Sequence, residues 1–156
     1  MAALVTGAGH RIGRAMALHL AKHGFDIAVH YSGSRDGALD TVDKIRSMGR
    51  RAEAIQANFL DEDETKGLIN QAATAVGPLT VLVNNASIFE EDTLKTATQE
   101  SWDRHFKSNL RAPFVLIQEF SSQVPDANTD NEPLARGLIV NMIDQRVHKL
   151  TPQFMT

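Results

Sequence analysis

Short, β-rich apolar runs alternate with longer segments of helical period along the chain, and this alternation limits the possible fold more than any other feature. Strands joined by helices of this length form right-handed βαβ crossovers, which make the sheet parallel and cover both of its faces. The runs at residues 79–83 and 138–140 are continuously apolar, as is typical of buried parallel strands. The sequence therefore predicts an α/β fold with a doubly wound parallel sheet. The predicted strands are residues 2–6, 27–31, 51–57, 79–83 and 137–141, the helices are 12–23, 36–48, 61–76 and 99–123, and a polar surface loop covers 125–133.

Composition excludes several classes of protein. The length of 156 residues fits one domain, and a net charge of -3 gives no basic surface for nucleic acid or anionic lipid. The absence of cysteine excludes disulfides, thiolate zinc sites and cysteine nucleophiles. No apolar run approaches the roughly 20 residues that span a bilayer, and the amino end lacks the cationic region of a signal peptide. We expect a cytoplasmic protein that binds a small molecule, with no metal, nucleic acid or membrane.

A glycine-rich segment lies between the first predicted strand and the first predicted helix. Small residues there let the backbone approach a pyrophosphate, while the helix amino end supplies free N–H groups and partial positive charge. A P-loop is excluded because no Gly-Lys-Ser/Thr closes the turn. A ligand-free βα turn is the alternative. The residues predicted to bind the pyrophosphate are Thr6, Gly7, Gly9, Arg11, Ile12 and Gly13.

The motif Thr-Gly-x-x-x-Arg-Ile-Gly at residues 6–13, with Asn-Asn-Ala-Ser at residues 84–87, resembles the short-chain dehydrogenase/reductase family. Arg11 stands where most members have a glycine. Together with Asn-Asn-Ala-Ser-x-Phe, it resembles the pteridine reductase branch and its dihydromonapterin reductase relatives. The resemblance implies a Rossmann-like fold, an NADPH-dependent hydride transfer to a pterin such as dihydromonapterin or dihydrobiopterin, and a homo-oligomer (dimer or tetramer) when full length.

The end of the second predicted strand bears on the choice of nicotinamide cofactor. An enzyme that uses NAD usually has an acidic residue there, which accepts from the ribose 2′-OH and repels a 2′-phosphate. This chain has hydroxyls, a glycine and a guanidinium, which favour NADPH. A solvated polar loop is the alternative. The residues predicted to contact the cofactor here are His30, Tyr31, Ser32, Ser34 and Arg35.

The resemblance also assigns residues after the third and fourth strands. Asn58 stands where the family commonly has an adenine-binding aspartate, and Phe59 follows it. After the fourth strand, Asn85, Ala86 and Ser87 are expected along the cofactor. The residues expected to line the pterin slot are Arg11, Ser87, Phe89 and Asp144.

Two residues are expected to take part in catalysis. By resemblance, Asn109 perturbs the long helix, and its backbone holds a water of the proton relay. Asp144 occupies the position of the family's catalytic serine, where a carboxyl group could relay a proton to a pterin nitrogen. The alternatives are an exposed helix asparagine and an ordinary loop aspartate.

The family's Tyr-x-x-x-Lys motif is not present in the 156 residues. The single tyrosine, Tyr31, lies in the wrong strand, and the expected tyrosine would follow Thr156. We therefore expect residues 1–156 to be a dinucleotide-binding domain truncated before its catalytic segment, with the apolar side chains of Phe106, Phe114 and Ile117 partly uncovered. A generic carbonyl or 3-oxoacyl reductase and a non-catalytic nucleotide-binding module remain alternatives to a pterin reductase.

Overall fold

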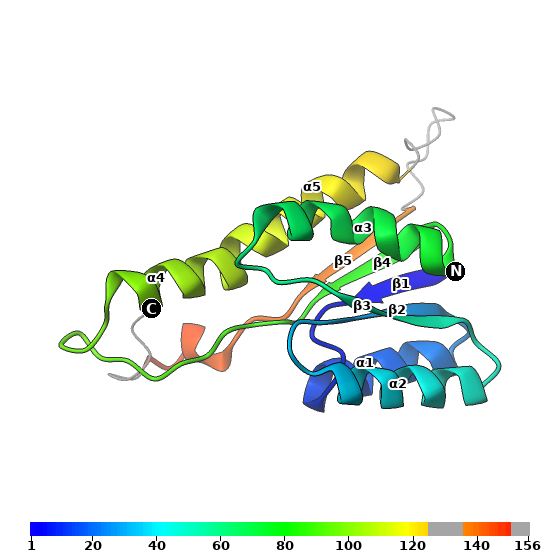
Figure 1. Ribbon diagram of the computed structural model, residues 1–156, viewed down its shortest axis with the longest axis horizontal. Coiled ribbons are helices and arrows are strands. Elements are labelled where there is room, and N and C mark those ends of the chain that lie inside the picture. Colours follow the sequence, from blue (N-terminus) through cyan, green and yellow to red (C-terminus); the bar gives the residue numbers. More distant parts are fainter. Residues whose placement is uncertain (125–135, 151–156) are drawn as a thin grey trace.

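The computed structural model describes residues 1–124 and 136–150. The loop predicted at residues 125–133 lies outside these ranges. A five-stranded parallel sheet has the strand order β3-β2-β1-β4-β5 (Figure 1), which confirms the predicted doubly wound fold. The elements in chain order are β1 (Ala2–Val5), α1 (Arg11–Lys22), β2 (Asp26–Tyr31), α2 (Arg35–Ser47), β3 (Ala52–Gln56), α3 (Glu62–Val76), β4 (Leu79–Asn84), α4 (Gln99–Phe106), the π-helical turn η1 (Lys107–Arg111), α5 (Ala112–Gln123), β5 (Leu138–Asn141) and the 3-10 turn η2 (Gln145–Val147).

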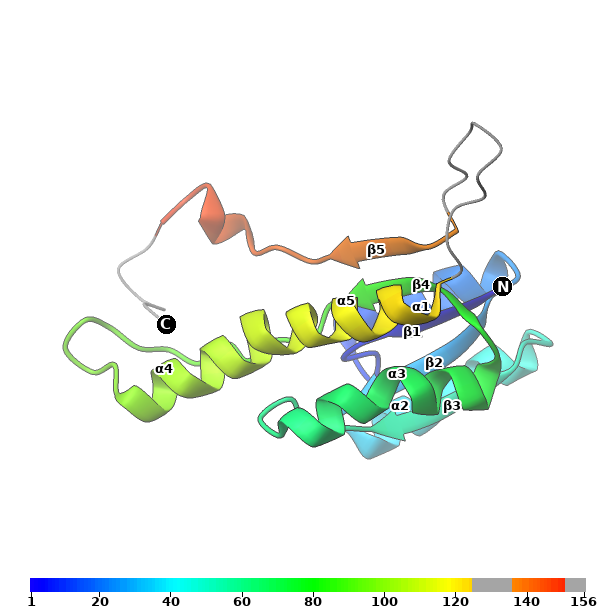
Figure 2. The same cartoon turned by 90° about the horizontal axis from the view of Figure 1, so that it is seen from above.

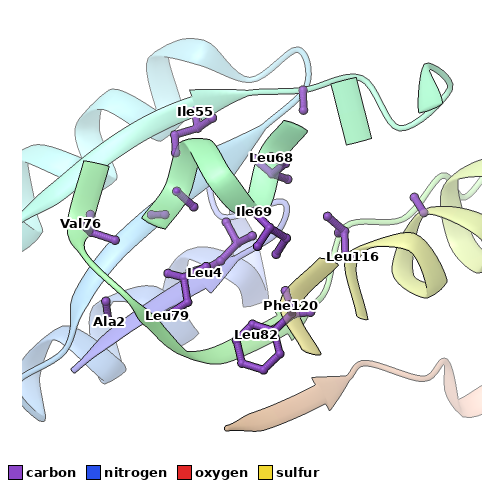
Figure 3. Packing of buried hydrophobic residues seen from close by; sticks show 14 of the residues in the cluster. Ala2, Leu4, Ile55, Leu68, Ile69, Val76, Leu79, Leu82, Leu116 and Phe120 are labelled. Carbon is purple, nitrogen blue, oxygen red and sulfur yellow. The ribbon is translucent and has the colours of Figure 1, made fainter. Parts of the chain in front are cut away.

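Helices cover both faces of the sheet. Helices α1 and α2 lie on one face, and α3 and α5 lie on the other (Figure 1). A first core cluster, shown in Figure 3, packs α3 and α5 against the strands through Leu4, Leu82 and Phe120. A second cluster on the opposite face includes Val5 and Val29. Strands β1 and β2 are buried along their whole length because both faces are covered.

The predicted long helix forms, but it changes from an α-helix to a π-helix over one turn. Helix α4 leads through the π-helical turn η1 into α5, and the three form one rod (Figure 2). Phe106 and Phe114, which were expected to be partly uncovered, are exposed, and the rod buries a different set of side chains, some polar and some apolar. The exposed side chains are Trp102, Phe106, Leu110 and Phe114, whereas Ile117 is half-buried, and the buried ones are His105, Ser108, Ala112, Val115, Leu116 and Phe120.

No helix in the described part of the chain is long and apolar enough to cross a membrane.

Candidate functional site

The candidate site lies at the carboxyl ends of the parallel strands. The strand order runs outward from β1 through β2 and β3 on one side, and from β4 to β5 on the other. The connections that follow β1 and β4 therefore leave the sheet in opposite directions, and this topological switch point is where doubly wound sheets bind ligands. The glycine-rich turn and the Asn-Asn-Ala-Ser segment both begin there. Helix α4 and turn η2 extend beyond the same end of the sheet (Figure 1).

Thr6 joins the ends of β1 and β4 through side-chain hydrogen bonds. Its Oγ1 donates to the carbonyl of Val83 (3.2 Å) and accepts from the amides of Asn85 and Ala86 (both 2.9 Å). The Asn85 side chain in turn donates from Nδ2 to the carbonyl of Thr6 (2.8 Å). Three of the predicted cofactor residues are thus brought together. The polar side-chain atoms of Thr6 and Asn85 are used to hold the backbone around the site.

Two glycines of the glycine-rich segment permit neighbouring parts of the chain to come close to it. A Cβ on Gly13 would lie 2.3 Å from the carbonyl oxygen of Gly7 and 2.4 Å from Asn85 Nδ2. A Cβ on Gly9 would lie 2.5 Å from Ser34 Oγ. Gly13 thus lets the amino end of α1 rest directly on the turn, which leaves the first amides of the helix at the mouth of the site, and Gly9 lets the turn approach the start of α2.

The amino end of α1 is suited to an anion. Within the described residues, the side chain of the capping residue His10 makes no hydrogen bond to the first turn of the helix. The amides of that turn and the positive end of the helix dipole therefore face the site without a side-chain cap. The side chains of Arg11 and Ile12 are exposed at this point.

Arg11 has an unusual backbone conformation, with φ of +48°. This left-handed region favours glycine, because the Cβ of an L-residue crowds the following carbonyl there. The geometry accounts for the glycine that most members of the family have at this position. The motif at residues 6–13 contains the substitution but carries no sign of the left-handed backbone.

His30 and Tyr31 are placed inside the fold, whereas the sequence had suggested direct contact with the cofactor. Their exposed fractions are 1% and 7%, because β2 is covered on both faces. The ring of His30 accepts from the Gly7 amide at Nδ1 (3.1 Å) and lies 3.0 Å from the Ala57 carbonyl through Nε2. Burial lowers the pKa of His30 to about 4, although the hydrogen bond to Ala57 acts to raise it. Both ring nitrogens are used within the protein, so the side chain supports the turn rather than facing a ligand.

Most of the other predicted residues near β2 and β3 are at the surface. Ser32 and Arg35 are exposed, and Ser34 is half-buried at the amino end of α2. Asn58 is exposed, and its Oδ1 accepts from the amide of Leu60 (3.1 Å). Phe59 is buried and stacks on the His30 ring, with centroids 4.4 Å apart. Of these five residues, Phe59 therefore packs in the core, Ser34 is partly accessible, and the other three are exposed to solvent.

The loop after β4 is anchored to the long rod by Asn109. The Asn109 side chain donates from Nδ2 to the carbonyl of Ile88 and accepts at Oδ1 from the amide of Ile88, both at 2.8 Å. His105 adds a second anchor, because its Nε2 accepts from the amide of Glu90 (3.2 Å). Asn109 lies within the π-helical turn, at the place where a perturbed helix was expected. Sequence reasoning missed both anchors, since their partners are backbone groups that carry no sequence signal.

Phe89 and Asp144 meet through Arg146. The guanidinium of Arg146 lies over the Phe89 ring, 4.7 Å from its centroid. Asp144 accepts at Oδ1 from the Arg146 amide (2.7 Å), and its Oδ2 lies 3.5 Å from the Arg146 side chain. Because a guanidinium is flat and stacks well on aromatic rings, its place over Phe89 marks a surface that can also hold a flat heterocycle.

The ends of β4 and β5 are joined by a side-chain amide pair. Asn84 Nδ2 donates to Asn141 Oδ1 (2.9 Å). The Oδ1 of Asn84 is buried and has no hydrogen-bond partner among the described residues. No group of three or more His, Asp or Glu side chains in the described ranges is arranged to hold a metal ion.

Comparisons with known proteins found similar sequences over most of the chain. A family model described as short chain dehydrogenase matches residues 1–148. The chain is 42% identical over 122 residues to the 3-oxoacyl-(acyl-carrier-protein) reductase FabG of Staphylococcus aureus, covering 78% of this chain and 50% of that protein. The chain thus spans about half the length of the curated relatives that it matches.

Solved structures are similar over nearly the whole chain. The FolM alternative dihydrofolate reductase 1 of Brucella canis, complexed with NADP, matches with a TM-score of 0.86 and 40% identity, covering 99% of this chain and 59% of that one. A short chain dehydrogenase of Burkholderia cenocepacia, also in complex with NADP, matches with a TM-score of 0.88 and 33% identity, covering 98% and 59%.

Proposed function

The chain belongs to the short-chain dehydrogenase family, and on that premise we propose that it forms the dinucleotide-binding part of an NADPH-dependent reductase. The observation that carries the proposal is the cradle at the switch point, where Gly13 packs on Gly7 with no room for a Cβ. A pyrophosphate fits the uncapped amides at the start of α1. When bound, NADPH supplies the hydride. The chain's own residues hold the cofactor and position the substrate.

The residues at the end of β2 support NADPH over NADH. No acidic side chain stands at residues 30–35 to repel a 2′-phosphate. The exposed guanidinium of Arg35 and the hydroxyls of Ser32 and Ser34 offer charge-assisted and neutral donors at the start of α2. The two structures described above, FolM and the Burkholderia enzyme, were both solved with NADP.

The pair of Phe89 and Asp144 supports a pterin as the substrate. A flat heterocycle would stack on the Phe89 ring, either in place of the Arg146 guanidinium or on the opposite face. Asp144 would then relay a proton, and Ser87 and Arg11 would line the slot. The likeness to FolM, which is described as an alternative dihydrofolate reductase, favours this class of substrate.

A 3-oxoacyl thioester is a second candidate substrate. The 42% identity to FabG of Staphylococcus aureus favours it. The Tyr-x-x-x-Lys motif, which would complete either reaction, does not occur in the 156 residues, so a nucleotide-binding module without catalysis is the third possibility.

The exposed apolar side of the α4–α5 rod supports a homo-oligomer of the full-length protein. Phe106, Leu110 and Phe114 are 40%, 61% and 51% exposed on it. Sedimentation of the full-length protein would detect a dimer or tetramer, and a monomer at micromolar concentration would contradict this part of the proposal.

Cofactor choice is tested by titrating NADPH and NADH into the full-length protein and its Arg35→Ala variant. We expect the variant to lose about tenfold or more in NADPH affinity and to keep its NADH affinity, because the lost bond is charge-assisted. Lys44→Ala is the matched control, since it removes an exposed cation from the far end of the same helix. Equal binding of the two cofactors by the wild type would refute the assignment.

Substrate class is tested by hydride transfer to a dihydropterin and to a 3-oxoacyl thioester. We expect turnover of the pterin, with Phe89→Leu raising KM and Asp144→Asn lowering kcat. Turnover of the thioester alone would favour the second candidate. Tight NADPH binding with no turnover of either substrate would favour a non-catalytic module.

A further inference from the structure

The glycine-rich turn is held from beneath by one residue of the neighbouring strand. The side chain of His30 accepts the Gly7 amide at Nδ1 (3.1 Å), and the main-chain carbonyl of His30 accepts the next amide, that of Ala8 (2.9 Å). Two consecutive amides of the turn are therefore oriented by a single residue that lies 1% exposed in the core.

The geometry determines the tautomer of the ring. A backbone amide can only donate, so Nδ1 must be unprotonated to accept from Gly7. Nε2 then carries the proton and donates it to the Ala57 carbonyl (3.0 Å). The stack on Phe59, with rings inclined by 5°, prevents the imidazole from turning away. The ring is thereby fixed between the ends of β1 and β3.

This arrangement bears directly on the cradle described above. Gly7 has φ of +63°, and its carbonyl oxygen is the atom on which Gly13 packs at the start of α1. The Gly7 amide belongs to the Thr6–Gly7 peptide and the Gly7 carbonyl to the next one, so a rotation of the first peptide would change φ at Gly7 and move the oxygen that follows it. The hydrogen bond at His30 Nδ1 opposes rotation of the first peptide, while the bond from the Ala8 amide to the His30 carbonyl holds the second.

We propose that His30 is a positioning residue for the cofactor, whose unprotonated Nδ1 fixes the Thr6–Gly7 peptide and with it the conformation of Gly7, so that the glycine-rich turn and α1 can receive the pyrophosphate. The proposal rests on the proposed NADPH function of the site. It replaces the direct contact expected from the sequence with an action through Gly7. A histidine that merely fills the core would serve equally well through either ring nitrogen, whereas this role requires the acceptor at Nδ1.

Two isosteric variants separate the roles of the two nitrogens. In His30→Asn, Oδ1 takes the place of Nδ1 and keeps an acceptor for Gly7, while the donor to Ala57 is lost. In His30→Gln, Nε2 keeps the donor to Ala57, while the acceptor for Gly7 is lost. The measurement is the NADPH dissociation constant of the full-length protein, taken beside the free energy of unfolding of each variant.

We expect His30→Asn to bind NADPH within about threefold of the wild type and His30→Gln to bind about tenfold more weakly, since a buried amide is left unsatisfied. The unfolding free energies should not follow this order, because each variant loses one buried hydrogen bond. Equal affinities of the two variants, or tighter binding by His30→Gln, would overturn the proposal. If the wild type fails to bind NADPH, the proposed function falls, which is a result distinct from equal variants on a binding wild type.

The wild type provides a second test that does not depend on the folding of variants. Nitrogen NMR of labelled histidine distinguishes a protonated from an unprotonated ring nitrogen. We expect Nε2–H at neutral pH, and a change in the Gly7 amide signal when NADPH is added. An Nδ1–H tautomer of His30 would overturn the proposal.

Discussion

Replacing Gly13 with alanine tests the close packing on which the cradle depends. The new methyl group would lie 2.3 Å from the carbonyl oxygen of Gly7 and 2.4 Å from Asn85 Nδ2. Real Cβ contacts do not come closer than about 3.0 Å, so the Gly7 peptide and α1 would have to separate by about 0.7 Å (3.0 less 2.3). The contact is with backbone, which cannot rotate away as a side chain can.

The magnitude follows from two opposing effects. Alanine in place of glycine inside a helix gains up to about 1 kcal/mol from propensity. Overpacking a tightly packed position costs about 1–3 kcal/mol, and Gly13 is buried against backbone. The unfavourable effect should prevail, so we expect Gly13→Ala to lower the free energy of unfolding by about 1–2 kcal/mol and to weaken NADPH binding.

Gly67→Ala is the matched control. Gly67 lies inside α3, and its new methyl group would meet only the flexible end of Gln71, at 3.2 Å. The control should therefore be stabilised by about 0.5–1 kcal/mol. Urea unfolding followed by circular dichroism measures both. If both substitutions stabilise the protein, the cradle is not close-packed and the reasoning is wrong.

Three further results are expected. Arg11→Gly should raise the free energy of unfolding by about 0.5–1 kcal/mol in urea titrations, because φ of +48° strains an L-residue; no gain would mean that the strain is absent. Asn109→Ala should cost about 1–2 kcal/mol and speed hydrogen exchange at the Ile88 amide, which loses its acceptor; unchanged exchange at Ile88 would contradict the anchor. Because the pKa of folded His30 is about 4 while that of the unfolded state is near 6.5, the unfolded chain binds this proton first, so the contribution of His30 to stability should be present above pH 6.5 and be lost, by up to about 3 kcal/mol, as the pH falls towards 4. His30→Asn should lose this part of the pH dependence, and an unchanged slope would refute the assignment.

The local sequence pattern predicted the architecture because each helix or strand signal depends on only a few consecutive residues. The glycines after the first two helices, Gly24 and Gly49, have φ of +90° and +76°, as a helix-terminating glycine should. The acidic first turn of α3 begins at Asp61, whose side chain accepts from two amides of that turn. Such signals are readable without knowing what lies across the sheet.

The rod of α4 and α5 shows where local pattern is insufficient. Its apolar period correctly indicates a helix, but the side chains of Trp102 and Phe114 are exposed while His105 and Ser108 are buried. The π-helical turn adds a residue to one turn and rotates the faces that follow it. Apolar residues at helical spacing therefore identified the element, and Phe106 and Phe114 are uncovered as expected, but the pattern gave no sign that His105 and Ser108 are buried.

The sequence by itself determined the parallel doubly wound sheet, the glycine-rich turn at its switch point and the absence of an acid at the end of β2, because period, glycine placement and residue type are local properties of the chain. The tertiary structure decided which side chains support the site and which face it. His30 holds Gly7 from the core, and Arg146 lies over Phe89 across a separation of 57 residues (146 less 89). These contacts join segments that are distant in the chain, and a hydrogen bond or a stacked cation depends on the position of the partner as much as on the residue itself.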